Sequence, residues 1–137
     1  MNNFKVLYVE DDDLLREEFA EYLARKAGKV SVARDGAEGL KSFNACKPDL
    51  VVTDISMPVM DGLQMVAFIK ESDPTVPIVF VTGTPGGVFE FNRFDQRIDK
   101  VMRKPVDLHE FSGILKYYAT RTLEPASVAQ QEIRPAE

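Results

Sequence analysis

Five polar residues in this sequence each follow a short apolar run, and their side chains suit the chemistry of phosphoryl groups. They are Glu10, Asp11, Asp54, Thr82 and Lys104. Three carboxylates that lie close together repel one another and need a counter-charge. A hard divalent cation supplies that charge, and Mg²⁺ prefers oxygen ligands while keeping several of its waters. These residue types therefore predict a metal-assisted acidic site, provided that the fold brings the five together.

Within such a site, the carboxylate of Asp54 would remain ionised and could act as a nucleophile toward a phosphoryl group. Lys104 would neutralise the phosphoryl oxygens as a point charge, and the Thr82 hydroxyl could donate a hydrogen bond to one of them. The competing interpretation is structural, because an aspartate at the end of a strand can simply cap the turn that follows. The stretch around Asp54 does not decide between the two interpretations, so the other strand ends must.

The elements that would position these residues alternate between strands and helices. Apolar, β-branched runs predict strands at 4–9, 30–33, 50–52, 78–81 and 100–103. Helical periodicity and capping residues predict helices over about 14–27 and 62–72, others beginning at 35 and 107, and a short, aromatic-rich one over 88–96.

This alternation predicts an α/β fold with a five-stranded parallel sheet and helices on both faces. Five strands suit the flavodoxin-like order 2-1-3-4-5, that is, a (βα)5 three-layer sandwich. In that order the third strand lies between the first and the fourth, so the five polar residues converge at the carboxyl edge of the sheet.

The composition is that of an ordinary globular domain and argues against several classes of function. Hydrophobic residues make up 45% of the chain and charged residues 28%, and the net charge is −5. The negative charge disfavours a nucleic-acid or membrane surface as the main partner. With one histidine, His109, and one cysteine, Cys46, a His/Cys zinc site and a Ser-His-Asp triad are poorly supported.

The length of 137 residues suits one domain with one core. We expect that domain over residues 1–122, and a tail or linker over 123–137, where two prolines occur and no apolar period continues. No apolar run approaches the ~18 residues of a membrane span, and the N-terminus lacks the apolar core of a signal peptide. The expected location is therefore the cytoplasm.

With its motifs placed in this way, the sequence resembles the receiver domains of bacterial response regulators, the phosphoacceptor modules of two-component (phosphorelay) signal transduction. The matching motifs are Val-Glu10-Asp11-Asp12, Asp54-Ile-Ser-Met-Pro58, Met60-Asp-Gly62, Val81-Thr82 and Lys104-Pro105. Each is weak alone, but all five occur in the family's order and on the expected elements. The resemblance spans about residues 4–119.

The resemblance implies that Asp54 is the phosphoacceptor and that Thr82 and Lys104 bind the phosphoryl oxygens. It also implies a Mg²⁺ ion, for which Mn²⁺ could substitute. Asp11, Asp54 and the backbone carbonyl of Ser56 would ligate this ion, with Glu10 acting through water. The Lys104–Pro105 peptide bond is expected to be cis.

The partners implied by the resemblance are proteins. A phosphohistidine on a histidine kinase or a histidine phosphotransfer protein would supply the phosphoryl group. A downstream protein or a fused output domain would respond to a switched interaction surface, without direct contact to nucleic acid or membrane. The expected function is a phosphorylation-switched signalling module, not a turnover enzyme.

Three alternatives share parts of this pattern. A metal-binding pseudo-receiver would normally have lost an acid, the threonine or the lysine, and none is lost here. An aspartyl-phosphate hydrolase needs a second acid two residues after its nucleophile, where this chain has Ser56. A flavin site on the same fold needs a phosphate-binding loop after the first strand, where Glu10 to Asp13 would repel a phosphate.

One position departs from the family pattern. Three residues before the lysine, the family usually has Tyr or Phe, whose ring moves inward on phosphorylation, and this chain has Val101. We therefore expect the conformational response to lie in the glycine-rich stretch Gly83–Gly87 and the helix after it, because glycine backbone is the least costly to rearrange.

Overall fold

A computed structural model describes residues 3–83 and 98–123 of the chain. The elements are β1 (Lys5–Val9), α1 (Asp13–Lys26), β2 (Lys29–Ala33), α2 (Gly36–Cys46), β3 (Leu50–Asp54), α3 (Gly62–Ser72), β4 (Ile78–Thr82), β5 (Lys100–Arg103) and α4 (Leu108–Leu123). The helix predicted over 88–96, most of the Gly83–Gly87 stretch and nearly all of the predicted tail lie outside the described residues.

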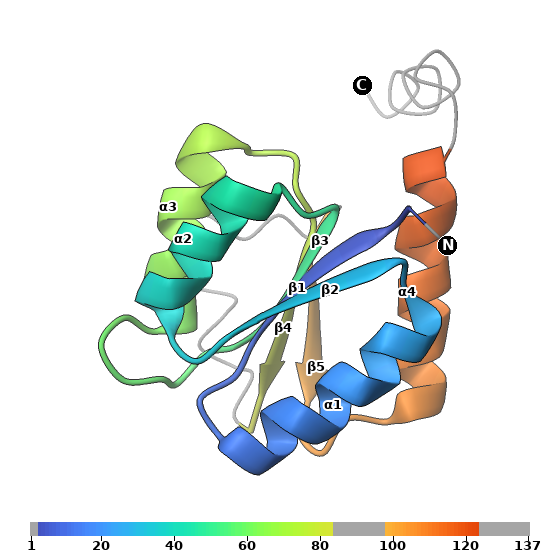
Figure 1. Ribbon diagram of the computed structural model, residues 1–137, viewed down its shortest axis with the longest axis horizontal. Helices are drawn as coiled ribbons and strands as arrows, with labels where there is room; N and C mark the ends of the chain where they lie inside the picture. Colours follow the sequence, from blue (N-terminus) through green and yellow to red (C-terminus); the bar gives the residue numbers. More distant parts are fainter. Residues whose placement is uncertain (1–2, 84–97, 124–137) are drawn as a thin grey trace. The chain divides into compact units, whose positions relative to one another are not determined.

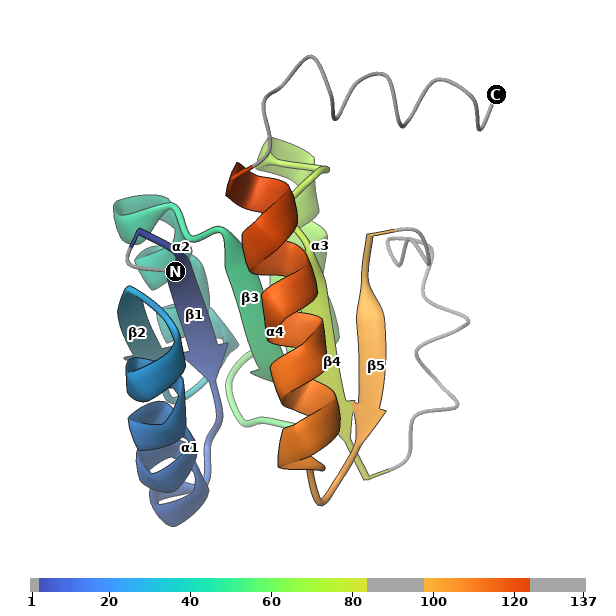
Figure 2. The ribbon, with the colours of Figure 1, turned by 90° about the vertical axis from the view of Figure 1, so that its right-hand side faces the viewer.

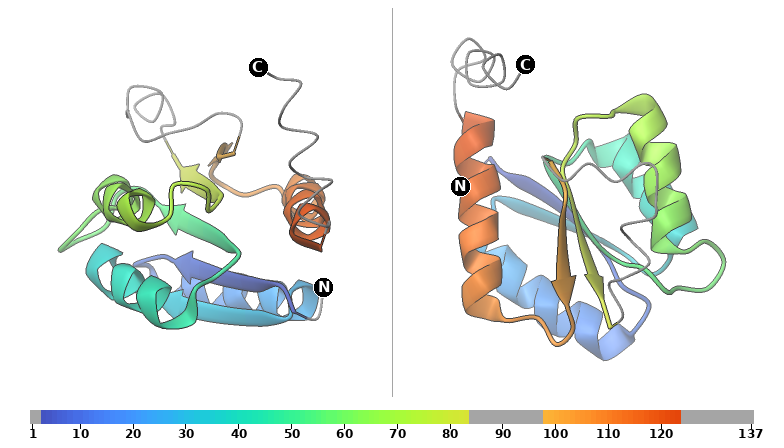
Figure 3. Two further views of the ribbon diagram at one scale, coloured as in Figure 1. Left: turned by 90° about the horizontal axis from the view of Figure 1, so that it is seen from above. Right: turned by 180° about the vertical axis from the view of Figure 1, so that it is seen from behind.

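The five strands form one parallel sheet in the order β2-β1-β3-β4-β5, which confirms the predicted strands and their order (Figure 1). Helix α1 lies on one face of this sheet, and α2 and α3 lie on the other (Figures 1 and 3). This arrangement follows from right-handed β-α-β crossovers, which place successive helices on opposite faces when the chain reverses direction along the sheet. The α/β, flavodoxin-like class predicted from the sequence is therefore confirmed.

The chain divides into two compact units, residues 1–106 and 107–137. The described part of the second unit is α4, one continuous helix (Figure 2). Asp107 caps it as predicted, since its Oδ1 accepts the backbone N–H groups of His109 at 2.9 Å and Glu110 at 3.1 Å.

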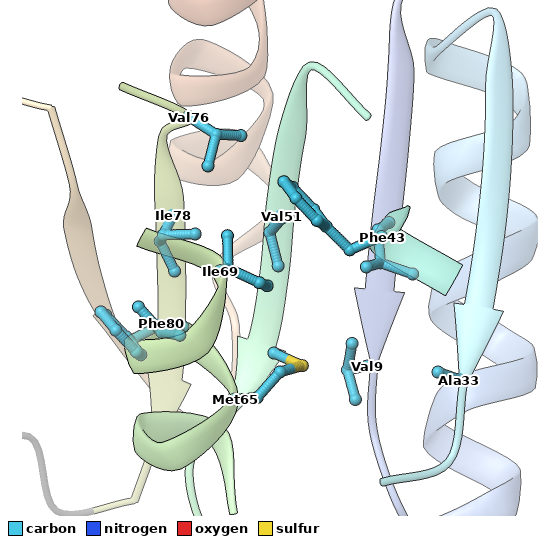
Figure 4. Close-up of a cluster of buried hydrophobic side chains, with 11 residues drawn as sticks. Val9, Ala33, Phe43, Val51, Met65, Ile69, Val76, Ile78 and Phe80 are labelled. Atoms are coloured by element: carbon cyan, nitrogen blue, oxygen red, sulfur yellow. The ribbon is translucent and has the colours of Figure 1, made fainter. Parts of the chain in front are cut away.

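One hydrophobic core cluster of the first unit lies between the sheet and helices α2 and α3. All five residues of β3 and all five of β4 are buried, as central strands of a parallel sheet should be. Figure 4 shows the resulting cluster, in which side chains of β1, β3 and β4 meet Met65 and Ile69 of α3 and Phe43 of α2. A Cβ at Gly39 would lie 2.5 Å from the Met65 sulfur and 3.0 Å from a Val9 methyl group, so a larger residue there would have to push these side chains aside.

Aspartates cap the helices of the first unit, and at α2 and α3 a Glu or Gln three residues after the aspartate makes a reciprocal capping box possible. Asp61 and Gln64 form the complete box at α3, with reciprocal hydrogen bonds of 2.8 and 3.1 Å. Asp35 accepts the Glu38 N–H at 2.8 Å, but the Glu38 carboxylate instead accepts the backbone N–H of Arg34 at 2.9 Å. The capping box at α2 is therefore only half formed, because the Glu38 side chain binds Arg34, the residue before the N-cap, and not the backbone of Asp35 itself.

Candidate acidic site at the carboxyl edge of the sheet

The polar residues predicted from the strand ends stand in neighbouring positions along one edge of the sheet. Asp54 is the last residue of β3 and Thr82 the last of β4, so each strand runs slightly further than its apolar run indicated. Glu10 and Asp11 follow β1, and Lys104 follows β5. The strands are in register at this edge, because Asp54 pairs with Val81 in the parallel ladder.

The three acids come together as predicted. One carboxylate oxygen from each of Glu10, Asp11 and Asp54 lies within 4.8 Å of the other two, and within residues 3–83 and 98–123 this is the only such cluster of potential metal ligands. Glu10 and Asp54 are buried, whereas Asp11 is exposed. A set made only of carboxylate oxygens fits a hard divalent cation, and the exposed member leaves an approach from solvent.

Lys104 links the acidic cluster to the carboxyl ends of β4 and β5. Its ammonium donates to Asp54 Oδ2 at 3.0 Å and to Glu10 Oε1 at 3.3 Å. Its backbone N–H donates to the carbonyl of Thr82 at 2.9 Å, which holds the end of β4 beside the lysine. The Lys104–Pro105 peptide bond is cis, as expected.

Backbone groups fix the orientation of both buried carboxylates. Asp54 Oδ1 accepts the N–H of Ile55 at 2.7 Å, and Glu10 Oε2 accepts the N–H of Asp12 at 3.1 Å. With one oxygen of each acid held by the backbone, the other oxygen faces Lys104. The site is thus pre-organised by the chain that follows each strand.

Two contacts that support the site were not predicted from the sequence. The Arg16 guanidinium donates to the Glu10 carbonyl at 2.9 Å and also pairs with Asp13. A Cβ at Gly62 would lie 2.1 Å from the carbonyl oxygen of Asp54, so glycine alone allows α3 to start against the end of β3. The spacing of Asp13 and Arg16 on one helix face could have indicated their ion pair, which holds Arg16 in place.

The electrostatics of the site reflect burial first and charge second. Burial raises the pKa of the Glu10 carboxyl, and the Asp54 charge adds to the rise, although the Asp12 N–H and Lys104 oppose it. Burial by itself lowers the pKa of the Lys104 ammonium, but Asp54 and Glu10 outweigh burial and the net pKa is raised. Burial, with Glu10 and Asp54, also raises the pKa of the neighbouring Tyr8 phenol.

The loop between β3 and α3 contains Ser56, whose backbone carbonyl is the remaining predicted metal ligand. Within it, the Met60 N–H donates to the Pro58 carbonyl at 2.8 Å, which makes a γ-turn with Val59 at its centre. Val59 has φ 69° and is 84% exposed, an unfavourable conformation for a β-branched residue. The Gly36 N–H donates to the Met60 carbonyl at 2.8 Å and so ties this loop to the start of α2. The role of the Ser56 carbonyl remains a prediction.

The position that departs from the family pattern lies within β5. Val101 is half-buried, pairs with Phe80 in the parallel ladder and packs against the core cluster of Figure 4. A small aliphatic side chain therefore occupies the place where the resemblance leads one to expect an aromatic ring.

Comparison with known proteins extends these observations. A model of the response regulator receiver domain matches residues 6–116. The chain is 32% identical over 102 residues to the transcriptional regulatory protein CseB of Streptomyces coelicolor, covering 74% of this chain and 43% of that protein. It is 29% identical over 130 residues to the transcriptional regulatory protein TrcR of Mycobacterium tuberculosis, covering 95% and 51%. The chain spans about half the length of these two relatives.

Solved structures of the same fold cover most of the chain. The N-terminal domain of an uncharacterized protein from Wolinella succinogenes superposes with a TM-score of 0.80 at 26% identity, covering 88% of this chain and 97% of that one. The response regulator TrrA from Thermotoga maritima, solved in complex with Mg(2+)-BeF, superposes with a TM-score of 0.73 at 25% identity, covering 84% and 98%.

Proposed function

Because the chain belongs to the response regulator receiver domain family, which its match over residues 6–116 establishes, we propose that Asp54 accepts the phosphoryl group. The family places the chain in two-component signal transduction. The observation that carries the assignment of the residue is the environment of Asp54. Its buried carboxylate lies 3.0 Å from the Lys104 ammonium and within 4.8 Å of the Glu10 and Asp11 carboxylates.

The donor set of the acidic cluster fits a Mg²⁺ ion. Asp11, Asp54 and the Ser56 carbonyl would hold it directly, and Glu10 would act through water. Mn²⁺, which also favours carboxylate and carbonyl oxygens, could take its place. When bound, the ion would offset the excess negative charge and stabilise the charge that develops on the transferring group. The related TrrA protein, solved with Mg(2+)-BeF, supports this proposal.

In the reaction we propose, an oxygen of the Asp54 carboxylate attacks the phosphorus atom of a phosphohistidine. The phosphorus–nitrogen bond breaks, and the imidazole leaves with the electron pair and takes up a proton from solvent. Lys104 neutralises the phosphoryl oxygens, and the Thr82 hydroxyl donates to one of them. The product is an aspartyl phosphate, whose extra charge and oxygens alter the contacts of Thr82 and Lys104.

The phosphohistidine donor would be a histidine kinase or a histidine phosphotransfer protein. The output would pass to a downstream protein or to a fused domain, since the relatives CseB and TrcR are about twice as long as this chain. The net charge of −5 supports a protein partner over direct nucleic-acid contact. We propose a cytoplasmic signalling module that modifies itself once per signal and does not turn over a substrate.

Among residues 3–83 and 98–123, no helix is both long enough and apolar enough to cross a bilayer.

The assignment of Asp54 can be tested by intact-mass measurement after incubation with acetyl phosphate, with and without Mg²⁺. We expect the wild type to gain one hydroxylamine-labile phosphoryl group only with Mg²⁺, and Asp54→Asn to gain none, because an amide is not a nucleophile here. Asp73→Asn is the matched control, since it removes a carboxylate whose hydrogen bonds to Thr75 an amide oxygen can also accept. Equal labelling of Asp54→Asn and the wild type would rule out the assignment.

A further inference from the structure

Helix α1 runs alongside the edge strand β2 (Figures 1 and 2). Side chains of both elements line a groove. The groove has a volume of about 580 Å³. Its lining combines charged residues of α1 with small and β-branched residues: Asp13, Arg16, Glu17, Ala20, Glu21, Ala24, Val30 and Val32. None of its lining residues belongs to the acidic cluster of Glu10, Asp11 and Asp54, although Arg16 at its edge donates to the Glu10 carbonyl.

The floor of the groove is apolar and unfilled. Ala20 and Ala24 stand one turn apart on α1, where larger side chains would close the space. Opposite them are Val30 and Val32 of β2, and Val32 is 44% exposed. A β-branched residue this exposed on an edge strand is a surface that another chain can cover.

The backbone of the same two valines is free to pair. In the parallel ladder, the Lys29 N–H donates to the carbonyl of Phe4, and the Ala33 carbonyl accepts the N–H of Glu10. Because N–H and C=O of successive strand residues point alternately to the two sides, those of Val30 and Val32 point away from β1. Within the described residues β2 has a strand neighbour on one side only.

The negative charge of the groove indicates which kind of ligand it favours. Asp13 is paired with Arg16, but Glu17 and Glu21 form no ion pair with any other residue among 3–83 and 98–123. The groove therefore carries uncompensated negative charge next to an apolar floor. This combination favours side chains with an apolar stem and a cationic head.

We propose that β2 accepts an extended segment of a partner protein in which lysine or arginine occupies alternate positions. The segment would add a strand to the sheet through the outer N–H and C=O groups of Val30 and Val32. Its alternate side chains would lay their methylene stems over these valines and bring their charged heads to Glu17 and Glu21. This docking does not depend on the phosphorylation of Asp54.

Two other occupants are disfavoured by charge. A second copy of this chain, paired edge to edge, would bring Glu17 and Glu21 close to the same acids of its partner. The residues after the last helix, 124–137, carry three acids and a single basic residue, Arg134. A cationic partner segment is the only one of the three that complements the groove.

A short synthetic peptide in which lysine and threonine alternate is a direct probe, because threonine favours the strand conformation. We expect its titration into the labelled full chain to shift the backbone amide resonances of Val30 to Val32 and of Glu17 to Ala24. A peptide with glutamate in place of lysine should not bind. Shifts centred elsewhere, equal binding of the glutamate peptide, or no binding by the lysine peptide would overturn the proposal, as would dimerisation of the free chain through β2.

Variants separate the contributions of charge and of strand pairing. The double variant Glu17→Gln, Glu21→Gln should weaken peptide binding by about tenfold, the effect of two exposed ion pairs. Glu18→Gln is the control, since Glu18 is an exposed acid of α1 outside the groove and its loss should leave affinity unchanged. An unchanged affinity of the double variant would contradict the charge complementarity.

Val32→Pro removes one outward N–H donor from an edge strand, where proline is tolerated, and should also weaken binding. If circular dichroism shows that this variant is misfolded, a peptide methylated at alternate backbone nitrogens tests the same hydrogen bonds from the other side. Equal affinity of the methylated and unmethylated peptides would exclude strand addition. Labelling of Asp54 by acetyl phosphate should be the same in all groove variants that fold, so this test is independent of the proposed phosphoacceptor.

Discussion

Two lysine–aspartate pairs lie at opposite ends of the sheet, and they differ in their surroundings more than in their geometry. The Lys104 ammonium is 3.0 Å from Asp54 Oδ2 at the carboxyl end, and the Lys70 ammonium is 3.1 Å from Asp99 Oδ1 at the amino end. The side chains of Lys70 and Asp99 are 5% and 0% exposed, compared with 29% and 9% for Lys104 and Asp54.

Among the described residues, the pair at the amino end joins one positive to one negative charge, and further hydrogen bonds hold both side chains. Besides Asp99, the Lys70 ammonium donates to the carbonyl of Val76 at 2.8 Å and that of Pro74 at 3.5 Å. Asp99 Oδ1 also accepts the N–H of Ile78, the first residue of β4, at 2.9 Å. One positive and one negative charge thus join α3 to the beginnings of β4 and β5.

The pair at the carboxyl end is unbalanced. Lys104 faces both Asp54 and Glu10, and Asp11 lies in the same cluster. Within residues 3–83 and 98–123, three acids thus share one lysine. Burying like charges costs free energy that the fold must offset elsewhere. The residue types of a buried ion pair therefore do not reveal its role, because both pairs join a lysine to an aspartate. The net charge around the pair does, since an excess of negative charge indicates a binding site for a cation.

Breaking the balanced pair should have the largest effect on stability. Lys70→Met removes the ammonium that faces the buried Asp99 carboxylate, and should lower the free energy of unfolding by about 3–5 kcal/mol. Urea denaturation measures the loss. The double variant Lys70→Met, Asp99→Leu should lose less than the sum of the two single variants, and simple additivity would contradict a direct pair.

Lys104→Ala should have a smaller effect, and one that depends on metal. Its removal leaves Glu10, Asp11 and Asp54 to repel one another, which should cost the metal-free protein about 1–3 kcal/mol. Thermal melts should show that Mg²⁺ recovers much of this loss. Mg²⁺ should stabilise Lys70→Met only as much as it stabilises the wild type. If Mg²⁺ stabilised both variants more than the wild type, the two lysine–aspartate pairs would not differ in their relation to metal.

Asp11→Ala should change stability in the opposite direction. In EDTA it relieves part of the repulsion in the cluster, and we expect a gain of roughly 0.5–1 kcal/mol. It should also weaken the stabilisation by Mg²⁺ more than Glu10→Ala does, because Asp11 is the proposed direct ligand. Asp12→Asn serves as the control, since it removes a neighbouring charge while an asparagine still caps α1. A lower melting temperature for Asp11→Ala in EDTA would argue against a crowded acidic cluster.

The smallest effect concerns pH. Because the pKa of Glu10 is raised in the folded state, folded protein binds this proton more tightly than unfolded protein does. In metal-free buffer, the contribution of Glu10 to the free energy of unfolding should therefore increase as pH falls through the raised folded pKa toward the ordinary value of 4.5. It should decrease again as pH rises. Denaturation of the wild type and Glu10→Gln across this range measures the difference. Parallel pH profiles for the two proteins would show that Glu10 does not contribute in this way.

The sequence predicted the unbalanced site well and did not predict the balanced pair. Glu10, Asp54 and Lys104 each stand at the carboxyl end of a strand, so alternation and strand order were sufficient to bring them together. Lys70 and Asp99 are 29 residues apart and follow no repeating pattern, so their meeting depends on tertiary packing alone. Gly62 was identified in a motif, but its contact with the carbonyl of Asp54 requires the backbone path of the loop between them.

The anchoring of β4 and β5 has a consequence for protein engineering. Lys104 binds the carbonyl of Thr82 at one end of the sheet, and Asp99 binds the N–H of Ile78 at the other. These two contacts fix the carboxyl end of β4 and its amino end, and neither uses residues 84–97. We expect the ends of β4 and β5 to keep their positions when the sequence between residues 84 and 97 is exchanged, because the contacts that fix these ends lie outside that stretch.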